Sequence, residues 1–174
     1  LIAKDIFGYS AKQTGLLFIY IGVCIVITQG GLIGIIVNRL KEPRTIIVGI
    51  CMLAVGQLGL MLLGSFSSLL LFTHLIIATS FVCIGFALTN PTLSSAASNV
   101  TSVNEMGSTL GVIQGFGSLG QVIGLLIAGP LYEAGGGQLS FGFGTTITAI
   151  FLAIAIIIGR VLNKHPNDLK NMSV

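Results

Sequence analysis

The sequence has little charge and no tryptophan. Its 174 residues include eight Lys and Arg and five Asp and Glu, which leave a formal net charge of +3. Because the basic residues are scattered and form no stripe interleaved with aromatic side chains, we exclude a nucleic-acid-binding surface. Apolar residues make up 53% of the chain, 24 residues are glycine, and the mean hydropathy is +1.02. This composition lies outside the range of soluble globular domains and indicates a membrane protein.

The sequence also lacks the motifs of metal, cofactor and catalytic sites. Cys24, Cys51 and Cys83 each stand alone in an apolar run, without a CxxC or Cys/His spacing, and are interpreted as small buried apolar residues. The segment GFGSLG, residues 115–120, fits G-x-G-x-x-G but lies inside a long apolar run. No HExxH, paired intramembrane Asp or GxSG-like turn is present. We expect no metal, no cofactor and no enzyme activity, with an intramembrane hydrolase as the weakest alternative.

Five apolar runs without Asp, Glu, Lys or Arg are present, at about 16–37, 46–64, 69–89, 110–132 and 141–159. At about 1.5 Å per residue, each is long enough to cross a hydrocarbon core of about 30 Å. Runs of this length without alternating polarity favour helices over barrel strands. We therefore predict an all-α membrane protein with five transmembrane helices.

The basic residues between these runs predict the orientation. One set of connections, the N-terminal tail with 65–68 and 133–140, carries Lys4 and Lys12. The basic residues of the other set, 38–45, 90–109 and 160–174, are Arg39, Lys41, Arg44, Arg160, Lys164 and Lys170. Because cytoplasmic loops are enriched in Lys and Arg, the second set is predicted to be cytoplasmic. We expect a multi-pass protein of the plasma (inner) membrane with a cytoplasmic C-terminus.

The first cytoplasmic connection carries a recognisable motif. From Gly34 the chain reads GIIVNRLKEPR, which resembles the G-x-x-x-D-R-x-G-R-R loop signature of the major facilitator superfamily. Gly34, Asn38, Arg39 and Arg44 match or nearly match, whereas Asn38 replaces the Asp and Lys41 replaces the second Gly. The resemblance implies a cytoplasmic gate in which Gly34 allows close helix approach and Arg39 donates to a carboxylate or helix-end carbonyls. The alternative is that these charges only orient the chain in the membrane.

Three further segments resemble the multidrug or tetracycline efflux branch of that superfamily. FGYSAKQTGLL is similar to the entry into helix 8, GFALTNPTLSS to the end of helix 10, and NEMGSTLGVIQGFGSLGQVIGLLIAGPLYE to helix 11. The resemblance implies helices 8–12, half of a twelve-helix bundle, with the first seven helices missing. It also implies a secondary active transporter that exports a drug-like molecule or metabolite by alternating access, coupled to an ion. The expected partners are that solute, the lipid bilayer and the missing N-terminal helices; the alternative is a non-transporting five-helix subunit.

Polar residues inside the predicted spans are the candidates for a substrate cavity. Gln29 lies within the first span, and Gln114, Ser118 and Gln121 recur at i, i+4 and i+7 in the fourth, on one helix face. A polar face on an apolar helix suggests water on that side. The resemblance adds that helices 8, 10 and 11 contribute to the central cavity of this superfamily. Hydrogen bonding between helices is the alternative role.

Small residues and one histidine complete the candidates. Gly111 and Gly115, and likewise Gly120 and Gly124, are four residues apart, a spacing that lets helices pack closely. His74 is the only ionisable side chain other than Cys or Tyr inside a predicted span, which makes it a candidate for proton handling. It also lies near the external end of its span and has the alternative of reaching the interface.

Overall fold

A computed structural model describes residue 8 and residues 10–65 and 68–164, and within these ranges every regular element is helical. The predicted all-α class is therefore confirmed. The elements are α2 (Ala11–Ile27), the π-helical turn η1 (Thr28–Leu32), α3 (Ile33–Leu40), α4 (Glu42–Met61), the 3₁₀ turn η2 (Leu62–Ser65), α5 (Ser68–Val100) and α6 (Met106–Lys164). By length and composition, four described stretches could cross a membrane: Ala11–Leu40, Glu42–Met61, Leu70–Val100 and Met106–Ile157.

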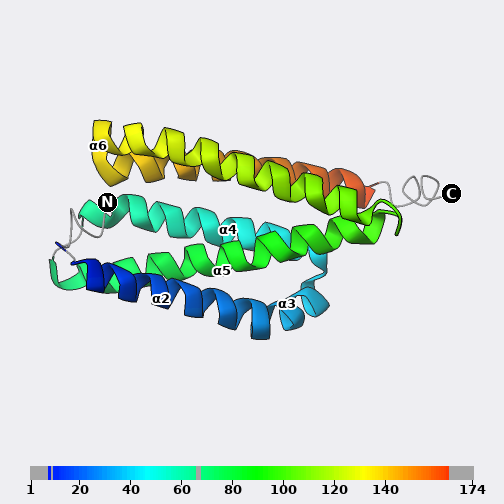
Figure 1. Ribbon diagram of the computed structural model, residues 1–174, viewed down its shortest axis with the longest axis horizontal. Helices are drawn as coiled ribbons and strands as arrows, with labels where there is room; N and C mark the ends of the chain where they lie inside the picture. The colour runs from blue at the N-terminus through cyan, green and yellow to red at the C-terminus, as the bar shows by residue number, and fades with distance from the viewer. Residues whose placement is uncertain (1–7, 9, 66–67, 165–174) are drawn as a thin grey trace.

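The fourth of these stretches accounts for the difference from the five predicted spans. Helix α6 is 59 residues long but leaves helical geometry at Gly135 (φ −148°, ψ 20°) and Gly136 (φ 64°, ψ −160°). Glycine adopts the positive φ of the second residue without a Cβ clash. The chain reverses there, so that the two arms of α6 run side by side (Figure 1), and the Ser140 hydroxyl donates to the Ala128 carbonyl at 3.4 Å. The connection predicted over 133–140 is thus reduced to two non-helical residues.

Helix α5 is also longer than its apolar run. It continues through Pro91 to Val100, so that only residues 101–105 separate it from α6, whereas the sequence predicts a connection over 90–109. Hydroxyl groups in this polar extension donate to carbonyls four residues earlier, for example Ser98 to Ser94 at 2.9 Å. The helix therefore extends beyond the apolar pattern that predicts it.

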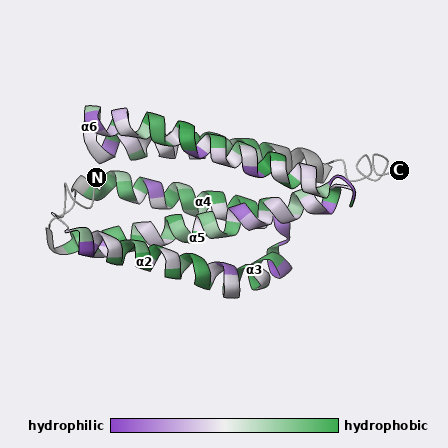
Figure 2. Cartoon of the chain, in the orientation of Figure 1, coloured by the Kyte–Doolittle hydropathy of each residue, from purple (hydrophilic) through white to green (hydrophobic). Residues whose placement is uncertain are grey.

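The helices lie roughly in a row. Helix α2 packs on α5, α5 packs on α4, and α4 packs on α6, so α2 and the α6 arms form the two edges (Figure 1). The buried apolar side chains are Leu63, Leu75, Ala78, Cys83, Ala87 and Leu88. Outward-facing residues are largely apolar as well (Figure 2), and large side chains such as Phe116 and Val26 are 71% and 69% exposed. Such a surface suits lipid rather than water.

The closest helix contact is between α4 and α5, and glycines make it possible. A Cβ atom on Gly56 would lie 2.6 Å from the Val82 nitrogen and 2.8 Å from the Ala78 carbonyl oxygen. A Cβ on Gly85 would lie 2.6 Å from the Gly49 carbonyl oxygen. Because the obstructing atoms belong to the backbone, larger residues here would force the two helices apart.

Candidate functional site

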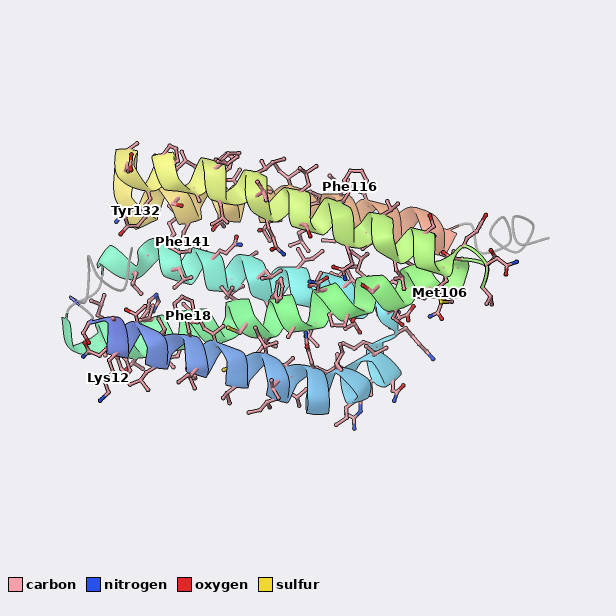
Figure 3. The ribbon with its side chains drawn as sticks, viewed as in Figure 1. Lys12, Phe18, Met106, Phe116, Tyr132 and Phe141 are labelled. Carbon is pink, nitrogen blue, oxygen red and sulfur yellow. The ribbon has the colours of Figure 1, made fainter. Side chains whose placement is uncertain are left out.

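A cavity of about 760 Å³ lies between α2, α4, α5 and both arms of α6. Its lining residues are Thr14, Leu17, Phe18, Ile21, Ile25, Leu53, Gln57, Leu60, Leu75, Thr79, Val82, Cys83, Phe86, Leu125, Ala128, Gly129, Tyr132, Ser140 and Phe141. In Figure 3, Phe18 on α2 and Tyr132 and Phe141 on α6 lie at the end of the bundle where α6 reverses. Most of the lining is apolar and none of it is charged.

A few hydrogen-bonding groups interrupt this lining. On α4, the Gln57 side-chain oxygen accepts a hydrogen bond of 2.9 Å from the Thr148 hydroxyl, which also lies 2.9 Å from the Gly144 carbonyl oxygen. Thr79 on α5 is buried, and Ser140 bonds back to the first α6 arm. A concave, mainly apolar surface with a small number of placed polar groups is typical of a site for a neutral organic molecule.

The predicted cavity residues lie elsewhere in the chain. Gln29 is exposed in η1, and Gln114, Ser118 and Gln121 are exposed on the first arm of α6. None of the four lines the cavity, and their role in solute binding stays a prediction. Sequence reasoning missed Gln57, although it is a polar residue in the middle of a predicted span, the criterion that selected Gln29.

The predicted gate residues lie together at the opposite end of the helices. Gly34, Asn38 and Arg39 are on α3 and Arg44 is in the first turn of α4, and all four are exposed. Between them, Lys41 has φ 66° and ψ 160°, a conformation that favours glycine. Lys41 occupies the position where the loop signature has its second glycine. A glycine at this position, as in the signature, would adopt this conformation without strain.

A carboxylate next to this turn joins two helices. One side-chain oxygen of Glu42, at the start of α4, accepts hydrogen bonds from the Ser95 hydroxyl at 2.6 Å and the Asn99 amide at 2.8 Å, both near the end of α5. The negative charge also lies in the first turn of α4, where it complements the helix dipole. Sequence reasoning did not predict this contact, because Ser95 and Asn99 each lie more than fifty residues after Glu42.

The predicted ionisable residue contacts the backbone of a neighbouring helix. His74 is half-buried, and its Nε2 lies 2.9 Å from the Gly59 carbonyl oxygen of α4. The contact ties the start of α5 to the last turns of α4. A role for His74 in proton handling stays a prediction.

The predicted packing glycines of α6 have no close neighbour among the described residues. Gly111, Gly115, Gly120 and Gly124 are exposed, and a Cβ atom on any of them would meet nothing within 4 Å. Close packing occurs instead through glycines of α4 and α5. Cys83 is buried and the other two cysteines are half-buried, all three as free thiols.

Long apolar helices around a largely apolar cavity define an integral membrane protein. A family model described as Major Facilitator Superfamily matches residues 1–172. The chain belongs to this superfamily, as its loop motif predicts.

Two curated relatives agree with this assignment. Mouse major facilitator superfamily domain-containing protein 10 is 27% identical over 171 residues, which cover 96% of this chain and 34% of the relative. Multidrug resistance protein 2 of Bacillus subtilis (strain 168) is 26% identical over 165 residues, 95% of this chain and 37% of the relative. The chain thus spans about a third of the length of these relatives. A comparison with solved structures finds no match.

Proposed function

We propose that this chain is the C-terminal part of a secondary active transporter that moves a small, uncharged or amphipathic organic molecule out of the cell. The superfamily match along nearly the whole chain carries this proposal. Similarity to a protein named for multidrug resistance supports export, and the mainly apolar cavity supports a solute of low polarity. Both arms of α6 cross the membrane in this proposal, which makes five crossings with a cytoplasmic C-terminus.

The position of the cavity supports alternating access. Its lining includes Thr14 near the start of α2 and Tyr132 and Ser140 on either side of the α6 reversal. The distribution of basic residues predicts that this end is external, whereas Arg39 and Arg44 are at the cytoplasmic end. The cavity would then receive or release solute on the external side while the cytoplasmic ends are closed.

Ion coupling requires a group that this cavity does not supply. None of its lining residues is Asp, Glu, Lys or Arg. In the proposed transporter, the coupling group belongs to further membrane helices, which complete the twelve-helix bundle, or to His74 on α5.

Transport of a fluorescent apolar dye by the full-length protein tests the proposal. Cells that express it should accumulate less dye than cells with the empty vector, and proteoliposomes should concentrate the dye when an ion gradient is imposed. Because Gln57 is one of the few polar groups of the cavity, we propose that its amide also hydrogen-bonds the solute, and we expect Gln57→Leu to lower the transport rate about fivefold through the loss of a bond of about 1 kcal/mol. Gln138→Leu, an exposed position outside the cavity, is the matched control.

The same experiment has a clear contrary result. If the full-length protein reaches the membrane and no dye in a panel of neutral and cationic compounds is moved, export of such molecules is wrong. A non-transporting subunit then becomes the function to test.

A further inference from the structure

Helix α3 is set apart from the helices around it. None of its eight residues, Ile33–Leu40, is buried. Thr28 and Thr45, five residues beyond its two ends, are 1% and 0% exposed, whereas its immediate neighbours Leu32 and Lys41 are exposed. Among the described residues, the segment is therefore held by buried residues some way beyond each end and packs little between them.

The N-terminal end of α3 is a weakened stretch of helix. Residues Thr28–Leu32 form a π-helical turn, in which the Ile33 amide donates to the Thr28 carbonyl. Such turns are rare within α-helices and are frequently found at functional sites. Gly30 and Gly31 lie inside this turn, and a Cβ on either would meet nothing within 4 Å. Packing among the described residues therefore does not require these glycines, which lower the stability of the helix relative to alanine by about 1 kcal/mol each.

The C-terminal end of α3 is a strained residue. Lys41, with φ 66° and ψ 160°, adopts a backbone conformation that costs a non-glycine residue about 1–3 kcal/mol. Hydrogen bonds hold it there: the Lys41 amide donates to the Val37 carbonyl at 2.9 Å, and the Thr45 amide and hydroxyl donate to the Lys41 carbonyl at 3.1 and 2.9 Å. Lys41 is the residue between α3 and α4, so a change in the direction of α3 relative to α4 would change its backbone angles.

The neighbouring helix is weakened at the same depth. The Tyr20 hydroxyl on α2 lies 2.5 Å from the Ser80 hydroxyl on α5, sixty residues later. Because α2 and α5 run in the same direction in the bundle (Figure 1), the turn at 28–32 lies level with residues 88–92 of α5. That stretch contains Pro91, which has no amide to donate, and Thr92, a buried hydroxyl without a hydrogen-bond partner among the described residues. At this level α5 therefore lacks one backbone donor and has one unpaired buried hydroxyl among the described residues, although the Thr89 hydroxyl donates to the Gly85 carbonyl.

We propose that α3 pivots as one rigid helix between Gly30–Gly31 and Lys41, and so moves Asn38 and Arg39 relative to the fixed ends of α4 and α5. Those ends are held together by Glu42, Ser95 and Asn99. The pivot rests on the proposed function in one respect: the side chains that it moves, Asn38 and Arg39, are those predicted to form the cytoplasmic gate. It requires two positions of α3 in the membrane-embedded protein.

Distances between spin labels in the full-length protein, reconstituted in nanodiscs after replacement of native cysteines by Ala, test the pivot. Labels at Asn38→Cys on α3 and Leu93→Cys on α5, both exposed, report α3. Labels at Val48→Cys and Leu93→Cys report the close-packed α4 and α5 as the control pair. We expect two distances for the first pair and one narrow distance for the control.

The glycine variant makes the test specific. In the Gly30→Ala, Gly31→Ala background, the α3 pair should collapse to a single distance while the control pair is unchanged, which also shows that the bundle is folded. Lys41→Gly removes the strain at this residue. It should change the ratio of the populations at the two α3 distances severalfold. A single narrow α3 distance in the unmodified background, or two distances that persist in the alanine variant, would overturn the pivot. If the unmodified background shows both α3 distances but the full-length protein transports no dye, the result counts against the proposed function and not against the pivot.

Discussion

Gly56 is one of the glycines that leave least room for a side chain. A Cβ there would lie 2.6 Å from the Val82 nitrogen and 2.8 Å from the Ala78 oxygen, and backbone atoms in a helix cannot move aside cheaply. We expect Gly56→Ala to lower the free energy of unfolding by about 1–3 kcal/mol through overpacking, measured as a lower Tm of the detergent-solubilised protein. Gly117→Ala, where nothing lies within 4 Å, is the control. Equal Tm values for both variants would contradict the close α4–α5 contact.

Two buried threonines give opposite predictions. Thr92 is 1% exposed and its hydroxyl has no hydrogen-bond partner in the described part of the chain, whereas the hydroxyl of Thr45, 0% exposed, donates to the Lys41 carbonyl. Replacing an unpaired buried hydroxyl by a methyl group removes a desolvation cost, and replacing a paired one removes a bond. We expect Thr92→Val to raise stability and Thr45→Val to lower it, each by about 1 kcal/mol. The Tm of each variant, compared with that of the unmodified protein, tests this prediction. Tm shifts of the same sign in both variants would contradict the contrast between an unpaired and a paired hydroxyl.

At the scale of elements, the contact between α4 and α5 at their predicted cytoplasmic ends depends on Glu42. We expect Glu42→Ala to lower stability by about 1 kcal/mol, because two hydrogen bonds to a charged, half-exposed acceptor are lost. Ser95→Ala added to Glu42→Ala should cost little more, since its partner is already gone. Glu133→Ala, an exposed carboxylate at the other end of the bundle, is the control. Additive losses in the double variant would show that the Ser95 bond does not form.

The sequence predicts the helices better than it predicts their ends. Apolar runs without charge indicate membrane helices because lipid requires every backbone group to be paired within the segment. The apolar runs do not show that α5 continues to Val100, because that extension is polar. Backbone hydrogen bonds maintain a helix there without an apolar pattern. Nor do the apolar runs show how short the reversal at Gly135–Gly136 is, because two glycines in a glycine-rich chain carry no distinct signal.

The residues of the candidate site are predicted less well than the helices. Polar residues inside apolar runs can be found in the sequence, but the neighbour that each one faces depends on how its helix is rotated about its axis. Gln57 contacts Thr148, ninety-one residues later, whereas Gln121 is exposed although both lie inside predicted spans. The gate motif is local in sequence, and its residues are accordingly found close together on α3 and at the start of α4.

At the scale of the whole molecule, the orientation in the membrane can be measured directly. In the full-length protein without native cysteines, Val103→Cys, 85% exposed in the turn before α6, should react with a membrane-impermeant maleimide only after permeabilisation. Ala134→Cys, exposed next to the α6 reversal, should react in intact cells. Reaction of both from outside, or in the reverse order, would contradict the orientation that the positive-inside bias predicts.

The reversal in α6 has a consequence for biosynthesis. Only Gly135 and Gly136 separate two long apolar arms, so no soluble loop stands between them to be translocated on its own. As the ribosome delivers the second arm, the first is still beside it at the translocon, and the two can partition into lipid together as a helical hairpin. An arm made alone would lack its partner arm, to which it is joined by contacts such as that of the Ser140 hydroxyl with the Ala128 carbonyl. Premature stops within the second arm should therefore yield a product that is degraded, even though the first arm is intact.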